Sequence, residues 1–139
     1  MKFAVLGMLS IVAGAIGFAW FVSQEQRKNR RKLLIDRDSL SDDAILSRYF
    51  ADAPTSERQI ISAWHAVADA LYVSSGLLRP DDKFADLSGL PMWFISYDSD
   101  LTDTGGLLDY IYSVSRSEKI EEKDLSTIGD AVRILAPYR

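Results

Sequence analysis

The chain of 139 residues has no cysteine and a single histidine, His65. Without thiols it forms no disulfide, no thiolate nucleophile and no sulfur-ligated metal site. A lone histidine is more typical of a surface or packing residue than of a ligand or base. The sequence also lacks a glycine-rich phosphate loop and a supported Ser/His/Asp set. We therefore expect no enzymatic activity from this chain on its own.

Charge is missing from residues 3–22, an apolar run near the start of the chain. A helix of that length is about 30 Å long, enough to cross the hydrocarbon core of a bilayer. Trp20 and Phe21 stand where an interfacial aromatic belt falls. A cleaved signal peptide is the competing interpretation, but the basic cluster follows the run and no small-x-small cleavage site is present. We expect residues 1–23 to be a single-pass transmembrane anchor that contacts the lipid bilayer through residues 3–22.

Positive charge is concentrated directly after this run, whereas only Lys2 and the terminal amine lie before it. The positive-inside rule then places the N-terminus outside and the C-terminal body in the cytoplasm, at an inner or plasma membrane. Anionic lipid headgroups are the partners that such a cluster attracts. This basic collar consists of Arg27, Lys28, Arg30, Arg31 and Lys32.

The rest of the chain has the opposite charge. Residues 33–139 hold ten basic and nineteen acidic side chains, against six basic and one acidic in residues 1–32. Nucleic acid binding needs clustered Lys and Arg, so the acidic body argues against it. We divide the chain into the anchor (1–23), a basic juxtamembrane linker (24–38) and a helical domain (39–139).

Helix signals dominate the body, which is predicted to be all-α. The predicted helices begin at Ser39 or Ser41, at an S-x-x-Q capping box on Ser56, near Leu101, and at a T-x-x-D box on Thr127. Residues 74–97 are interrupted by glycine and proline but are too apolar to lie in solvent, which predicts a long structured loop. Gly105 and Gly106 each cost about 1 kcal/mol against alanine in a helix, so the first turns after residue 101 should be loose.

Three motifs resemble the acyl carrier protein family, in the same order along the chain. "LRPDDKFADL" (residues 78–87) is similar to the segment leading to the family's second helix, and "DLSTIGDAVRIL" (residues 124–135) resembles its closing helix. Between them, "DSDL" (residues 98–101) stands where the family has D-S-L, so that Asp100 separates the serine from the leucine. The resemblance implies a small bundle of three to five helices, an acidic second helix that docks on basic partners, and a 4′-phosphopantetheine arm on Ser99.

These observations favour a membrane-anchored cytoplasmic docking module of acyl-carrier-like fold, without enzymatic activity, that presents its acidic second-helix region to a basic protein partner. A genuine carrier of an acyl or similar group, with phosphopantetheine on Ser99, is the alternative. The residues expected at the partner surface are Asp98, Asp100, Asp103, Asp109 and Trp93.

The acidic segment also partly fits a calcium-binding loop. Asp98, Asp100, Thr102 and Asp109 occupy positions 1, 3, 5 and 12 of that template, but Asp103 replaces the glycine of position 6. A calcium-binding module is therefore a less favoured alternative.

Trp93 follows Pro91 within an apolar cluster of the long loop. Burial in the core is the commoner fate of such a cluster, and an exposed knob for a partner or a lipid surface is the alternative.

Overall fold

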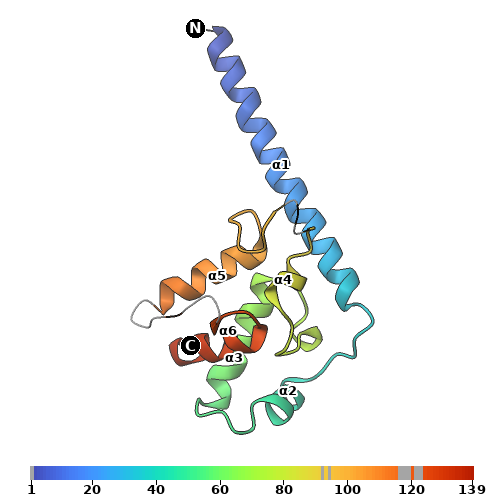
Figure 1. The fold of residues 1–139 in the computed structure, drawn as a ribbon, viewed down its shortest axis with the longest axis vertical. Helices are drawn as coiled ribbons and strands as arrows, with labels where there is room; N and C mark the ends of the chain where they lie inside the picture. Colours follow the sequence, from blue (N-terminus) through green and yellow to red (C-terminus); the bar gives the residue numbers. More distant parts are fainter. Residues whose placement is uncertain (1, 92, 94, 116–119, 121–123) are drawn as a thin grey trace.

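The protein consists of a small helical body from which one long helix projects (Figure 1). The computed structural model describes residues 2–91, 93, 95–115, 120 and 124–139. Helix α1 (Lys2–Leu34) runs without interruption through most of the expected juxtamembrane linker. The charged segment after residue 24 continues the same helix as far as Leu34.

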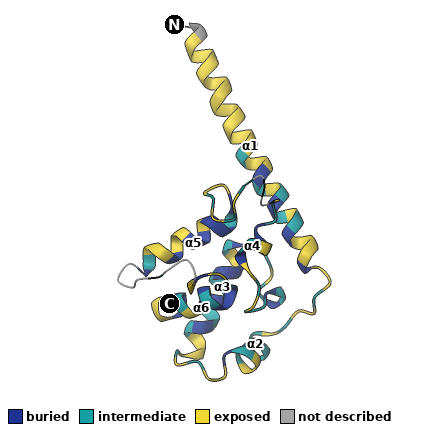
Figure 2. Cartoon of the chain, viewed as in Figure 1, coloured by how far each residue is buried: buried dark blue, intermediate teal, exposed yellow. Residues whose placement is uncertain are grey.

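The N-terminal half of α1 is exposed over several turns. Residues 4–18 are all exposed, and Val22 is the first fully buried residue of the helix (Figure 2). Within the described part of the chain, α1 is the one helix long and apolar enough to cross a membrane. An apolar surface of this extent is stable in lipid and unfavourable in water.

The body is all-α over its described residues, as predicted. It contains α2 (Asp42–Tyr49), α3 (Glu57–Ala70), α4 (Phe84–Leu87), α5 (Asp103–Val114) and α6 (Ile128–Leu135), with 3-10 turns η1 (Ser75–Leu77) and η3 (Ala136–Tyr138). Hydroxyl N-caps begin the longer helices: Ser41 for α2, Ser56 for α3, Thr102 for α5 and Thr127 for α6. Each cap satisfies a backbone N–H that has no partner within its helix.

Helix α3 forms the centre of the body and packs against α2, α5 and α6. Its apolar face is buried as the periodicity predicts, and Trp64 on that face is fully enclosed. The indole Nε1 of Trp64 donates a hydrogen bond to the carbonyl of Ser75 at 2.9 Å, and Phe50 meets its ring edge-on with centroids 5.8 Å apart. This bond satisfies the one polar group that Trp64 brings into the core.

The first part of the long loop between α3 and α5 is structured, because it is bonded to the start of α6. Phe84 N–H donates to the carbonyl of Ser126 at 3.1 Å, and Ile128 N–H donates to the carbonyl of Asp82 at 2.9 Å. The Asp82 carboxylate in turn accepts two 2.7 Å hydrogen bonds from Arg37, just after α1. Hydrogen bonding to this carboxylate raises the pKa of Arg37.

Asp130 holds the start of α6 in a reciprocal cap. Its carboxylate accepts hydrogen bonds from the backbone N–H groups of Ser126 (3.1 Å) and Thr127 (3.0 Å), while the Thr127 hydroxyl accepts from Asp130 N–H at 3.3 Å. Partial burial opposes ionisation of the carboxyl, but these hydrogen bonds outweigh it and lower the pKa of Asp130.

We predict that Asp130→Asn lowers the free energy of unfolding by about 1 kcal/mol at neutral pH, the value of a lost cap. A carboxyl whose pKa is lowered by folding stabilises the protein above its unfolded pKa, and the stabilisation is lost as the pH falls through the folded pKa. The difference between wild type and variant should therefore shrink below about pH 4. Urea unfolding of the full chain in detergent micelles measures it, with the exposed Asp81→Asn as control. A difference independent of pH would contradict the role of the charge.

Candidate functional site

A buried ion pair joins α1 to the body. Arg30 is completely buried, and its Nη1 donates to the Asp103 carboxylate at 3.0 Å. The same guanidinium donates to the backbone carbonyls of Leu87 and Leu71, each at 2.6 Å, while its Nη2 has no hydrogen-bond partner among the described residues. Arg27 lies 3.4 Å from the same carboxylate and stacks on the Tyr72 ring, 3.5 Å from its centroid. One carboxylate at the start of α5 therefore neutralises two cations of α1.

Uncharged contacts surround this pair and hold both ends of the loop between α4 and α5. Gln26 accepts from Asp103 N–H at 2.8 Å and donates to the carbonyl of Leu101 at 3.3 Å. Asn29 donates to the carbonyl of Gly89 at 2.7 Å. Gly89 has φ +73°, and a Cβ at this position would lie 2.1 Å from the Gln26 carbonyl oxygen. Only glycine fits both this conformation and this close approach.

The positions of Asp103 and Arg30 differ from those expected from the sequence. Asp103 was expected at a partner surface and Arg30 at lipid headgroups, but each is turned inward to the other. Their pairing explains why, since a buried arginine needs a counter-charge. Lys28, Arg31 and Lys32 remain exposed on α1.

Ser99 lies in the turn before α5 and is half-buried. The carrier resemblance implies a serine at the first turn of a helix, whereas the N-cap of α5 is Thr102, whose hydroxyl accepts from Gly105 N–H at 3.0 Å. The Ser99 hydroxyl instead accepts from Leu101 N–H at 3.3 Å.

Gly105 has a packing role that the helix propensity does not reveal. A Cβ at Gly105 would lie 2.1 Å from the carbonyl oxygen of Ser99, so the turn folds directly against the helix backbone. The expected loosening of these first turns is not observed, since α5 is continuous from Asp103 to Val114. The glycine allows close approach of two backbone segments.

A small acidic hollow forms between this turn and α5. It has a volume of about 210 Å³ and is lined by Tyr97, Asp98, Leu108, Asp109, Tyr112 and Leu125. Asp98 and Asp109 are exposed, and neither forms an ion pair with a residue that the structure describes. Asp100 is exposed nearby in the chain but does not line the hollow. The hollow thus brings two aspartates and two tyrosines together at the protein surface.

The calcium-loop template does not assemble. Thr102 caps α5 with its hydroxyl, and Asp103 faces the arginines of α1. No group of three or more His, Cys, Asp or Glu side chains within the described ranges is close enough to hold a metal ion.

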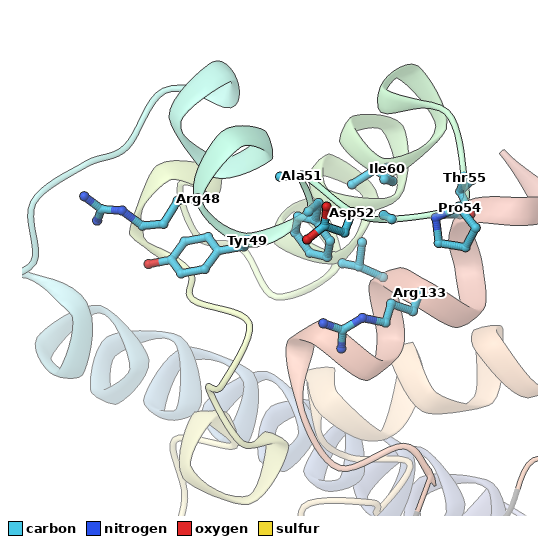
Figure 3. A pocket seen from close by; sticks show the side chains of 12 residues that line it. Arg48, Tyr49, Ala51, Asp52, Pro54, Thr55, Ile60 and Arg133 are labelled. Atoms are coloured by element: carbon cyan, nitrogen blue, oxygen red, sulfur yellow. The ribbon is translucent and has the colours of Figure 1, made fainter.

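A second pocket, which the sequence did not suggest, lies at the far end of the body from the N-terminus of α1 (Figures 1 and 3). Its volume is about 370 Å³, and its walls are residues from 48–60, between α2 and the start of α3, and from 132–136, in α6 and the start of η3. Figure 3 shows the side chains of Arg48 and Tyr49 at one end of the group that lines this pocket and those of Pro54 and Thr55 at the other. Arg133 lies over the Phe50 ring, 5.8 Å from its centroid. The walls come from two segments that are far apart in the sequence, so no local motif could reveal the pocket.

The fold and these surfaces define a class: an all-α body on a single helix that could cross a membrane, with a charged junction and an acidic hollow. Comparison of the chain with protein families, curated proteins and solved structures found no significant match. The resemblance to acyl carrier proteins therefore stays a prediction from the three motifs.

We predict that Asp103→Ala lowers the free energy of unfolding by about 3 kcal/mol or more, because it leaves Arg30 buried without its counter-charge. Denaturant unfolding of the full chain in micelles measures the loss. Asp100→Ala, an exposed carboxylate three residues earlier, is the matched control and should change stability by less than about 0.5 kcal/mol. Equal effects of the two substitutions would contradict a buried junction. Replacing both partners, in Arg30→Met/Asp103→Leu, should recover much of the loss.

Proposed function

We propose that this protein is a single-pass, membrane-anchored docking module of acyl-carrier-like fold that binds a basic protein partner and has no enzymatic activity. The observation that carries the proposal is the hollow lined by Asp98 and Asp109. Because both carboxylates lack an ion-pair partner within the described structure, their charge is available to a ligand.

The chemistry of the hollow suits the end of a lysine or arginine side chain. Two carboxylates attract the cation, and the rings of Tyr97 and Tyr112 supply faces for its alkyl stem and for cation–π contact. A volume of about 210 Å³ suits one side chain better than a metabolite, since small-molecule pockets commonly enclose about 300–1,000 Å³. Complementary charge of this kind steers encounter and selects the partner.

Docking has more support from the geometry than attachment of a prosthetic group. A phosphopantetheine arm on Ser99 would start from a half-buried turn, three residues before the cap of α5. A phosphodiester there does not gain the unpaired N–H groups of the first helical turn, because Thr102 already caps it. The carrier alternative therefore ranks second.

We place the body in the cytoplasm, at an inner or plasma membrane, with the N-terminus outside. The support is the distribution of charge around the apolar run: the whole basic collar follows it, and Lys28, Arg31 and Lys32 are exposed beside the body. These three side chains are also the ones we propose to contact anionic headgroups.

We predict that Asp98→Asn/Asp109→Asn weakens binding of a fluorescent lysine-rich peptide by roughly three- to tenfold, since each exposed pair contributes up to about 1 kcal/mol. Fluorescence anisotropy with the full chain in micelles measures the Kd, which should also rise with salt. Asp43→Asn/Asp52→Asn removes the same charge from exposed residues elsewhere and should have a smaller effect. If both double variants bind alike, only net charge matters and the hollow is not a docking site.

A topology assay tests the orientation. Green fluorescent protein fused after Arg139 should be fluorescent, and alkaline phosphatase fused at the same position should be inactive, because the latter folds only outside the cytoplasm. Replacing Lys28, Arg31 and Lys32 by alanine should reduce this preference, since orientation follows the basic residues that flank the span. An active phosphatase fusion in the wild-type chain would reverse the assignment.

A further inference from the structure

We propose that the loop between α4 and α5 enters the interfacial layer of the bilayer that holds α1, with Trp93 as its anchor. The inference rests on the proposed membrane span of α1 and adds a second point of contact with the same lipid. Three observations carry it: the exposure of Trp93, the attachment of the loop to α1, and the level of that attachment along the helix.

Trp93 is 86 % exposed, the highest fraction of any large hydrophobic side chain in the described structure. The exposure exceeds that of Met8 and Ile11 within the apolar run of α1, at 72 % and 75 %. Tryptophan is enriched at membrane–water interfaces, because its ring is largely apolar while its N–H remains hydrated. Leu101, at the other end of the loop, is also 41 % exposed.

Both ends of the loop are attached to one short section of α1. Gly89 is bonded to Asn29 and touches the backbone of Gln26, and the side chain of Gln26 bonds to Leu101. The loop therefore starts and ends beside α1. In Figure 1 the part of the loop that leads into α5 rises beside α1, on the side of the body nearest the N-terminal half of that helix.

The loop is attached to α1 close to the point where the apolar run of the helix ends. The apolar run ends at Val22, and Gln26 follows one turn later on the same face, about 6 Å further along the axis. The polar layer on each side of the hydrocarbon core is about 5–7 Å thick. Val22 is already fully buried, so the body reaches up to the end of the apolar run. A loop that leaves α1 at Gln26 toward the N-terminus therefore lies at the depth of the headgroups.

A second contact would fix how the body sits on the membrane. Interfacial aromatic residues set the tilt and rotation of a transmembrane helix, which its length alone does not determine. Since Arg30 and Asp103 join α1 to the body, an anchor on the loop constrains the helix and the acidic hollow together.

Depth-dependent quenching tests this inference, and the absence of native cysteine makes single labels straightforward. The full chain carries an environment-sensitive fluorophore on Ser96→Cys, in the loop, and is reconstituted in vesicles of phosphatidylcholine and phosphatidylglycerol. A lipid with a spin label near the headgroup end of the acyl chain is the quencher. Trp20→Cys on α1 reports the interface directly, and Ala51→Cys, exposed between α2 and α3, reports the distant end of the body.

We expect quenching at position 96 comparable to that at position 20, and little at position 51. Trp93→Ser should reduce the quenching at 96 without changing it at 20, whereas Trp93→Tyr should largely preserve it, because tyrosine is also an interfacial residue. Quenching at 20 but not at 96 would overturn the inference and leave the membrane anchor intact. Absence of quenching at both positions would overturn the anchor itself, and the loop contact with it.

Discussion

The structure depends on one buried charge. Arg30 lies on the helix that leaves the body, yet its guanidinium binds the end of α3 through Leu71, the end of α4 through Leu87 and the start of α5 through Asp103. Desolvating a guanidinium costs several kcal/mol, which these acceptors must offset together. The fixed fork of arginine donors can satisfy carbonyls and a carboxylate at once, which the compact ammonium of lysine cannot. The surrounding contacts of Gln26 and Asn29 keep these acceptors in place.

This junction turns what composition suggests is a linker into a rigid connection. A charged segment without apolar periodicity is ordinarily solvated and flexible, which would let the body move independently of the anchor. Here α1 continues to Leu34, and its last turns contact the body through Gln26, Asn29 and Arg30. Rotation or tilt of α1 is therefore transmitted to α5 and to the acidic hollow beside it.

Local features of the fold could be predicted from the sequence, and long-range pairings could not. Ser56 and Thr127 cap helices as their motifs indicate, because a cap is satisfied within four residues. Arg30 and Asp103 are 73 residues apart, and each charge taken alone is typical of a surface. The glycines Gly89 and Gly105 were expected to interrupt or loosen the chain, but both permit close backbone contact that only the tertiary fold defines. Of the expected partner surface, Asp98 and Asp109 come together in one hollow, whereas Asp103 does not.

The net negative charge of the body bears on how close it can lie to an anionic membrane surface. Residues 33–139 hold nineteen acidic and ten basic side chains, so an anionic membrane surface repels them. On a flexible linker the body would move beyond the Debye length of about 8–10 Å, where this repulsion is screened. The structure instead holds the body against the end of the apolar run, where Val22 is buried. Lys28, Arg31 and Lys32 are exposed on the same helix, and their positive charge would offset part of this repulsion at that short distance.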